Sequence, residues 1–143
     1  MRLIPLKSPS VELEQFMTMW SRFVEEKSTA TQKLVDDATC QLFLFEHNGT
    51  TVGFSKVYLD QECFPDEDLP ELCLHILAFY ILPEFRRHHL GEMAFKLLRQ
   101  WGRDNKAALI EIEADSDESG RFLKEQGLDL VGKGVHRLFR GFV

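Results

Sequence analysis

The stretch from Leu72 to Leu82 constrains the fold most strongly, because it is apolar or aromatic at every position except His75. A run of this length and composition is typical of a β-strand that is buried on both faces of a sheet. Pro83 follows the run, and apolar residues then recur at helical spacing from Leu90 to Trp101. The sequence therefore predicts a buried central strand, then a tight turn, then an amphipathic helix.

The apolar patterns elsewhere predict further strands and helices around this centre. Ser8 is expected to cap a helix with the apolar stripe 13–24, and Ser116 to cap a short helix that Gly127 ends. The other expected elements are a first strand at 3–6, a short helix at 31–37, a hairpin at 41–58, an alternating strand at 108–114 and two closing strands at 128–142. This order predicts a mixed α/β domain in which the helix at about 87–103 crosses between two parallel strands.

Length and composition narrow the class of protein. The chain has 143 residues and a net charge of -6, which favours one soluble domain over residues 1–143 and argues against a dedicated nucleic-acid binder. Its three cysteines are too few for a disulfide framework, so we expect a cytoplasmic protein. Its longest apolar run is too short for a membrane span, so we expect no membrane partner.

The stretch from Ile81 to Met93 is the part of the sequence that indicates chemistry. A buried strand ends there and a helix begins, and the first N–H groups of a helix lack an intrahelical acceptor. The helix dipole adds partial positive charge, Arg86 and Arg87 add full charges, and Gly91 permits close approach of a ligand to the backbone. These features together predict a site for a phosphate-bearing ligand.

The pattern Ile81-x-Pro83-x-Phe85-Arg86-Arg87-x-x-x-Gly91 resembles the V-x-P-x-[YF]-R-[RG]-x-G-x-G/A signature of the GNAT superfamily of acyl-CoA-dependent N-acyltransferases. The resemblance implies a three-layer α/β domain with splayed central strands, acetyl-CoA as cosubstrate, and a homodimer. No metal is expected, because the adjacent His88 and His89 diverge on a helix and the sequence offers no suitably spaced third ligand. It also implies that strand backbone at Phe79, Tyr80 and Ile81 binds the pantetheine of acetyl-CoA. The pyrophosphate would then bind the N–H groups of residues 86–92, which are Arg86, Arg87, His88, His89, Leu90, Gly91 and Glu92.

The resemblance also suggests candidate catalytic residues. His75 lies 16 residues before Gly91, where similar family members carry a Glu or His that removes a proton from the amine. A hydrogen-bonded core histidine is the alternative. The Tyr that often protonates the leaving thiolate corresponds to Leu123, so Tyr80 is the candidate acid, or else a packed strand aromatic. Cys73 lies on the same side of the strand as His75, but a buried cysteine is usually inert.

The predicted function is transfer of an acetyl group from acetyl-CoA to a primary amine of a small molecule or peptide. The alternative is a CoA-binding regulatory module with little or no activity, because His89 and Leu123 depart from the family pattern. A nucleic-acid adaptor is a third possibility, based on the basic residues at 86–103. Acidic residues at 60–71 and 111–115 favour a cationic amine as acceptor, or else form solvated faces. Glu111, Glu113 and Asp115 are also candidates for a carboxylate pair for hydrolysis or for an alternative base.

Overall fold

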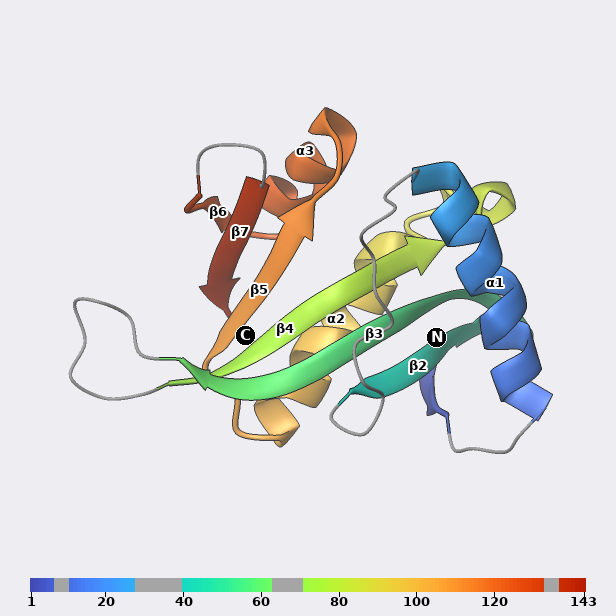
Figure 1. The fold of residues 1–143 in the computed structure, drawn as a ribbon, viewed down its shortest axis with the longest axis horizontal. Coiled ribbons are helices and arrows are strands. Elements are labelled where there is room, and N and C mark those ends of the chain that lie inside the picture. The colour runs from blue at the N-terminus through green and yellow to red at the C-terminus, as the bar shows by residue number, and fades with distance from the viewer. Residues whose placement is uncertain (7–10, 28–39, 63–70, 133–136) are drawn as a thin grey trace. The chain divides into compact units, whose positions relative to one another are not determined.

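A computed structural model of the protein describes residues 1–6, 11–27, 40–62, 71–132 and 137–143. Strands and helices follow one another in a mixed α/β order (Figure 1). Their bounds are β1 Arg2–Pro5, α1 Val11–Lys27, β2 Gln41–His47, β3 Thr50–Glu62, β4 Glu71–Ile81, the 3₁₀ turn η1 Pro83–Phe85, α2 Leu90–Asp104, β5 Leu109–Ala114, α3 Asp117–Glu125, β6 Asp129–Leu130 and β7 Arg137–Phe142.

The strands form a seven-stranded mixed sheet in the order β1-β2-β3-β4-β5-β7-β6. The hairpin of β2 and β3 and the parallel pair of β4 and β5, joined by α2, confirm the predicted topology. Cys73–Ile76 of β4 pair with Leu109–Ile112 of β5, whereas β4 itself continues to Ile81. The mixed α/β fold class predicted from the sequence is therefore confirmed.

The chain divides into two compact units. The first unit contains residues Met1–Val57 and Ala78–Leu97, and the second contains Tyr58–Leu77 and Leu98–Val143. The sequence-based expectation of one domain over residues 1–143 stays a prediction.

Helices cover both faces of the sheet within the first unit (Figure 1). On one face, α1 packs Phe16, Trp20 and Phe23 against aromatic side chains of β3 and β4. On the other face, the Phe79 ring of β4 contacts Phe95 of α2, at a centroid distance of 5.8 Å. Aromatic burial on both faces gives this unit a helix–sheet–helix layering, as the sequence predicts for a strand buried on both sides.

The core of the second unit lies between α3 and the strands β5 and β7. Leu123, Leu128 and Phe139 are almost fully buried there. Leu74 of β4 packs beside Gly102 of α2 in the same unit.

Several predicted details are wrong. The helix expected to begin near Arg87 begins at Leu90, because the 3₁₀ turn Pro83–Phe85 and the turn residues 86–89 come first. Met93, which belongs to the apolar stripe from Leu90 to Trp101, is 37% exposed and lies outside the core.

The sequence-based expectations at Ser8 and residues 31–37 lie outside the described residues. None of the helices within the described ranges has both the length and the apolar character that a bilayer span requires.

Candidate functional site

The turn between β4 and α2 is held to the sheet by backbone and side-chain hydrogen bonds within the first unit. The Leu82 N–H donates to the Val52 carbonyl oxygen at 2.9 Å. The Arg86 Nε donates to the Ile81 carbonyl oxygen, also at 2.9 Å, and its guanidinium lies 5.2 Å from the Tyr80 ring centroid. Arg86 therefore fixes the path of the turn, in addition to placing a positive charge there.

The same turn has an unusual backbone conformation. Arg87 and His89 have φ of +68° and +59°, in the left-handed region. A non-glycine residue in this region costs roughly 1–2 kcal/mol. Both side chains are exposed, and the Met93 N–H donates to the His89 carbonyl oxygen at 3.2 Å as α2 begins. Strained backbone of this kind clusters at ligand-binding sites.

The strand before the turn is packed by its aromatic side chains. Tyr80 is 2% exposed, and its ring contacts the rings of Phe23 and Phe54 at centroid distances of 5.3 and 5.7 Å. Phe79 lies on the opposite face, against Phe45 and Phe95. The rings thus fix this strand segment from both sides, and its main chain is held in register.

His75 lies in the second unit and is 5% exposed. Its ring stacks on the Tyr58 ring with a centroid distance of 4.4 Å and an interplanar angle of 9°. On its other side, the His75 Nδ1 lies 3.4 Å from the Glu111 Oε1. The parallel register aligns His75 with Glu111, so the two side chains emerge side by side from neighbouring strands.

Glu111 is bound in turn by Arg140 of β7. The Glu111 Oε2 accepts hydrogen bonds from the Arg140 Nε at 3.0 Å and the Arg140 Nη2 at 2.6 Å. The expectation that Glu111 belongs to a solvated strand face is therefore wrong, because the carboxylate is partly buried between a histidine and an arginine. Sequence reasoning missed Arg140, whose only signal is its register opposite Glu111 in the antiparallel pair.

Cys73, His75 and Glu111 each place a possible metal ligand atom within 4.8 Å of the others. A thiolate, an imidazole and a carboxylate can hold a zinc ion. However, the second oxygen of Glu111 is taken by the Arg140 guanidinium, and a divalent cation would stand beside that positive charge. The Arg140 charge beside Glu111 therefore disfavours a divalent cation at this cluster.

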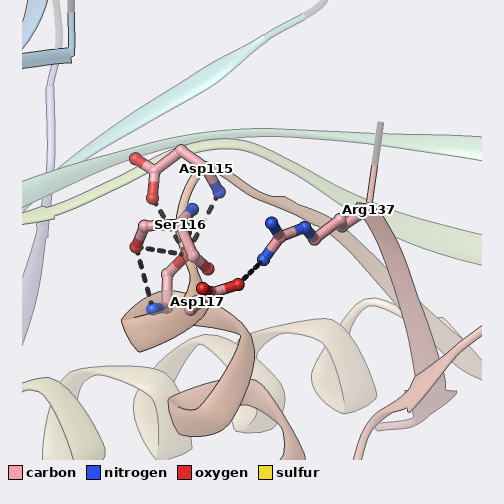
Figure 2. Close-up of polar contacts among 5 residues, drawn as sticks. Asp115, Ser116, Asp117 and Arg137 are labelled. Carbon is pink, nitrogen blue, oxygen red and sulfur yellow. Dashed lines mark hydrogen bonds and ion pairs between the residues drawn. The ribbon is translucent and has the colours of Figure 1, made fainter. Parts of the chain in front are cut away.

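The N-terminus of α3 is closed by its own side chains (Figure 2). Ser116 and Ser119 form a capping box, and the Ser119 Oγ donates to the Asp115 Oδ1 at 2.9 Å. Asp117 pairs with Arg137 of β7. The predicted cap at Ser116 and the stop at Gly127, which has φ of +86°, are confirmed. These contacts are structural, and they orient α3 against the sheet of the second unit.

The model of the acetyltransferase (GNAT) family matches residues 11–128. The chain belongs to the GNAT acetyltransferase family. Curated proteins gave no match.

Solved structures of acetyltransferases share the fold at low sequence identity. An acetyltransferase from Streptococcus agalactiae is 14% identical with a TM-score of 0.73, and the match covers 99% of this chain and 98% of that one. An acetyltransferase from Vibrio fischeri is 16% identical with a TM-score of 0.59, covering 77% and 93%. An aminoglycoside N-acetyltransferase in complex with CoA is 12% identical with a TM-score of 0.69, covering 93% and 95%.

This GNAT chain departs from the family signatures at two positions, His89 and Leu123. His89, which stands at the first glycine of the first signature, keeps the left-handed φ that glycine adopts readily. Leu123 stands where family members often have the Tyr that protonates the leaving thiolate, and it is 2% exposed in α3. The first departure preserves the backbone conformation of the turn, whereas the second removes a hydroxyl group.

Proposed function

We propose that this protein transfers an acetyl group from acetyl-CoA to a primary amine of a small molecule or peptide. Membership of the GNAT family supports acyl transfer in general. The turn before α2 is the observation that supports acetyl-CoA as the donor. There Arg87 and His89 hold a glycine-like backbone conformation without being glycine. A chain that keeps this costly conformation at the start of a helix has a use for the N–H groups that it presents.

We assign acetyl-CoA to the first unit. The pantetheine would bind main-chain groups of Phe79, Tyr80 and Ile81, whose side chains are fixed by aromatic contacts. The diphosphate would bind N–H groups of residues 86–92, where the α2 dipole and the exposed Arg87 supply positive charge. The site fits the ligand because the diphosphate needs donors and positive charge, and this turn offers both.

The reaction needs a base more than it needs an acid. An alkylammonium has a pKa near ~10.4 and must lose a proton before its nitrogen can attack the thioester carbon. His75 is the proposed acceptor of that proton, directly or through water. As the new C–N bond forms, the C–S bond breaks and CoA leaves as the thiolate. A thiol has a pKa near ~8.5, so this departure needs little help, and Tyr80 is the proposed proton donor.

The acceptor is proposed to be cationic. Glu113 is exposed on β5, where strand alternation puts it on the same face as Glu111, and Asp115 is exposed just after the strand. These carboxylates would attract a polyamine, a lysine side chain or an aminosugar. The acidic stretch 60–71 supports the same expectation, and its residues 63–70 lie outside the described part of the chain. A homodimer in the cytoplasm, without a nucleic-acid or membrane partner, completes the proposal.

The test combines binding with turnover. Acetyl-CoA at about one hundred times its Kd adds about 2.7 kcal/mol to the free energy of unfolding, so the Tm should rise by several degrees. CoA release with a panel of amines should then be detected for the wild type and lost in His75→Ala. Binding without release for any amine would favour the regulatory module that Leu123 suggests. An unchanged Tm would overturn both functions.

A further inference from the structure

Four side chains on four neighbouring strands form a continuous row in the second unit. Tyr58 of β3 stacks on His75 of β4 at 4.4 Å. His75 faces Glu111 of β5 at 3.4 Å, and Glu111 accepts two hydrogen bonds from Arg140 of β7. The proposed function uses only His75, so the other three need an explanation of their own.

The two oxygens of Glu111 have different tasks. The Oε2 accepts both hydrogen bonds from Arg140, the shorter at 2.6 Å, while the Oε1 faces the Nδ1 of His75. Two charge-assisted donors on one oxygen anchor the Oε2 and leave the Oε1 on the side of the imidazole. Arg140 therefore orients the Oε1 toward the imidazole, and the register of β5 with both neighbours maintains the row.

The charge state of the row determines which imidazole nitrogen carries the proton. An ionised carboxylate can only accept hydrogen bonds, so the Glu111 Oε1 favours a proton on the Nδ1 of His75. In a neutral imidazole the lone pair then lies on Nε2. The Tyr58 ring stacks within 9° of parallel, and it limits rotation of the imidazole about its own axis.

We propose that Glu111 and Arg140 are positioning residues, which hold His75 in the Nδ1–H tautomer so that Nε2 accepts the proton of the amine. This inference rests on the proposed function of His75 as the base. Glu111 stabilises the imidazolium that forms when His75 accepts the proton. Arg140 keeps the Glu111 carboxylate pointed at Nδ1, and it prevents Glu111 from turning away toward solvent.

The first measurement needs no variant. The ¹⁵N chemical shifts of the His75 ring, assigned by the loss of its signals in His75→Asn, report the tautomer in the folded wild-type protein. We expect the Nδ1–H form. The Nε2–H form in the wild type would overturn the proposal, and this result does not depend on whether any amine is turned over.

The second measurement changes the carboxylate. Glu111→Gln keeps the shape of the side chain but can offer an amide N–H to Nδ1, so the tautomer should become mixed and kcat should fall about 10–100-fold. The KM for acetyl-CoA should stay unchanged. Arg140→Lys should retain more activity than Arg140→Met, because only Lys keeps a positively charged side chain beside Glu111. An unchanged tautomer in Glu111→Gln would overturn the proposal.

The matched control is another Glu–Arg pair between neighbouring strands. In the first unit Arg2 of β1 pairs with Glu46 of β2 at 2.6 Å. Glu46→Gln makes the same chemical change and should alter neither the His75 tautomer nor kcat. If His75→Ala retains full activity, the base assignment fails. The NMR result still decides whether Glu111 fixes the ring, so the two failures are distinguishable.

Discussion

The carbonyl oxygen of Tyr80 occupies the space that a Cβ atom of residue 53 would need, and residue 53 is glycine. The neighbouring Leu82 N–H donates to the Val52 carbonyl oxygen at 2.9 Å, so the two strands cannot separate without losing hydrogen bonds. Gly53 is therefore required by the close approach of β3 to the strand segment that is proposed to bind acetyl-CoA.

Gly53→Ala should lower the free energy of unfolding by about 1–3 kcal/mol, because the added methyl group meets rigid backbone. Denaturant unfolding measures the change. Gly120→Ala is the matched control, since a Cβ there would lie 3.5 Å from Phe139, an ordinary contact, within helix α3. That control should be neutral or stabilising. A Gly53→Ala protein as stable as the wild type would contradict the packing that we describe.

The pH dependence of stability should contain a contribution from Glu84. Arg22 of α1 donates two hydrogen bonds to the Glu84 carboxylate, at 3.0 and 3.1 Å, and these lower the pKa of Glu84. A carboxyl whose pKa is lowered by folding stabilises the protein above its unfolded pKa. This stabilisation disappears as the pH falls through the folded pKa.

Glu84→Gln should therefore be less stable than the wild type at neutral pH and equally stable in acid. Urea unfolding over a pH series measures the difference. Arg22→Gln is the control, because removal of the donor should abolish most of the effect, and the double variant should resemble each single one. A difference between wild type and Glu84→Gln that persists unchanged in acid would show that the ion pair is not its cause.

His89→Gly tests the strained turn. Glycine adopts the left-handed φ of residue 89 without a steric penalty. His88 does not have a positive φ, so His88→Gly is the control, in which glycine only increases the entropy of the unfolded chain. His89→Gly should exceed His88→Gly in stability by about 1 kcal/mol. Calorimetric titration should show acetyl-CoA binding to His89→Gly at least as tightly as to the wild type. Equal stability of the two variants would contradict the strain at residue 89.

The strongest sequence patterns predicted the fold well because they are local and periodic. The apolar run before Pro83 and the helical spacing from Leu90 to Trp101 became β4 and α2. The start of α2 was placed too early, because Pro83–Phe85 forms a 3₁₀ turn whose length no periodic pattern encodes. A short irregular turn depends on hydrogen bonds such as that of Arg86, which the sequence does not display.

The sequence identified candidate site residues only where they lie within one segment of the chain. His75 and residues 86–92 lie close together along the chain, and a motif can identify them. Glu111 and Arg140 come from other strands, and their relation to His75 depends on register across two strand pairs. A strand with alternating acidic residues is also compatible with a solvated face. The role of Glu111 therefore becomes clear only when its partner on the neighbouring strand is known.

Glu113→Gln tests the proposed preference for cationic acceptors. Loss of an exposed carboxylate on β5 should raise the KM for a polyamine several-fold and leave the KM for a neutral amine unchanged, because only the charged acceptor is attracted. Initial rates with both amines measure this. Added salt should reduce the difference between wild type and variant, since it screens exposed charges. Equal KM changes for the two amines would assign Glu113 a general structural effect instead.

Tyr80→Phe separates the proposed acid from a packed aromatic ring. Phenylalanine keeps the contacts with Phe23 and Phe54, so the Tm and the Kd of acetyl-CoA should change little. If the hydroxyl protonates the departing thiolate, kcat should fall about tenfold or more. This loss is smaller than the ~10²–10⁴-fold contribution of general acid catalysis elsewhere, because a thiolate leaves readily without a proton.

Leu123→Tyr is the companion to Tyr80→Phe, since it returns a phenol to the position where the family often has one. It should not restore activity to Tyr80→Phe, because Leu123 is 2% exposed and the larger ring would overpack α3 at a cost of about 1–3 kcal/mol. Stopped-time assays of CoA release measure both variants. Full activity in Tyr80→Phe would leave the tyrosine as a packing residue beneath Arg86, and departure of CoA would then proceed without a protein acid.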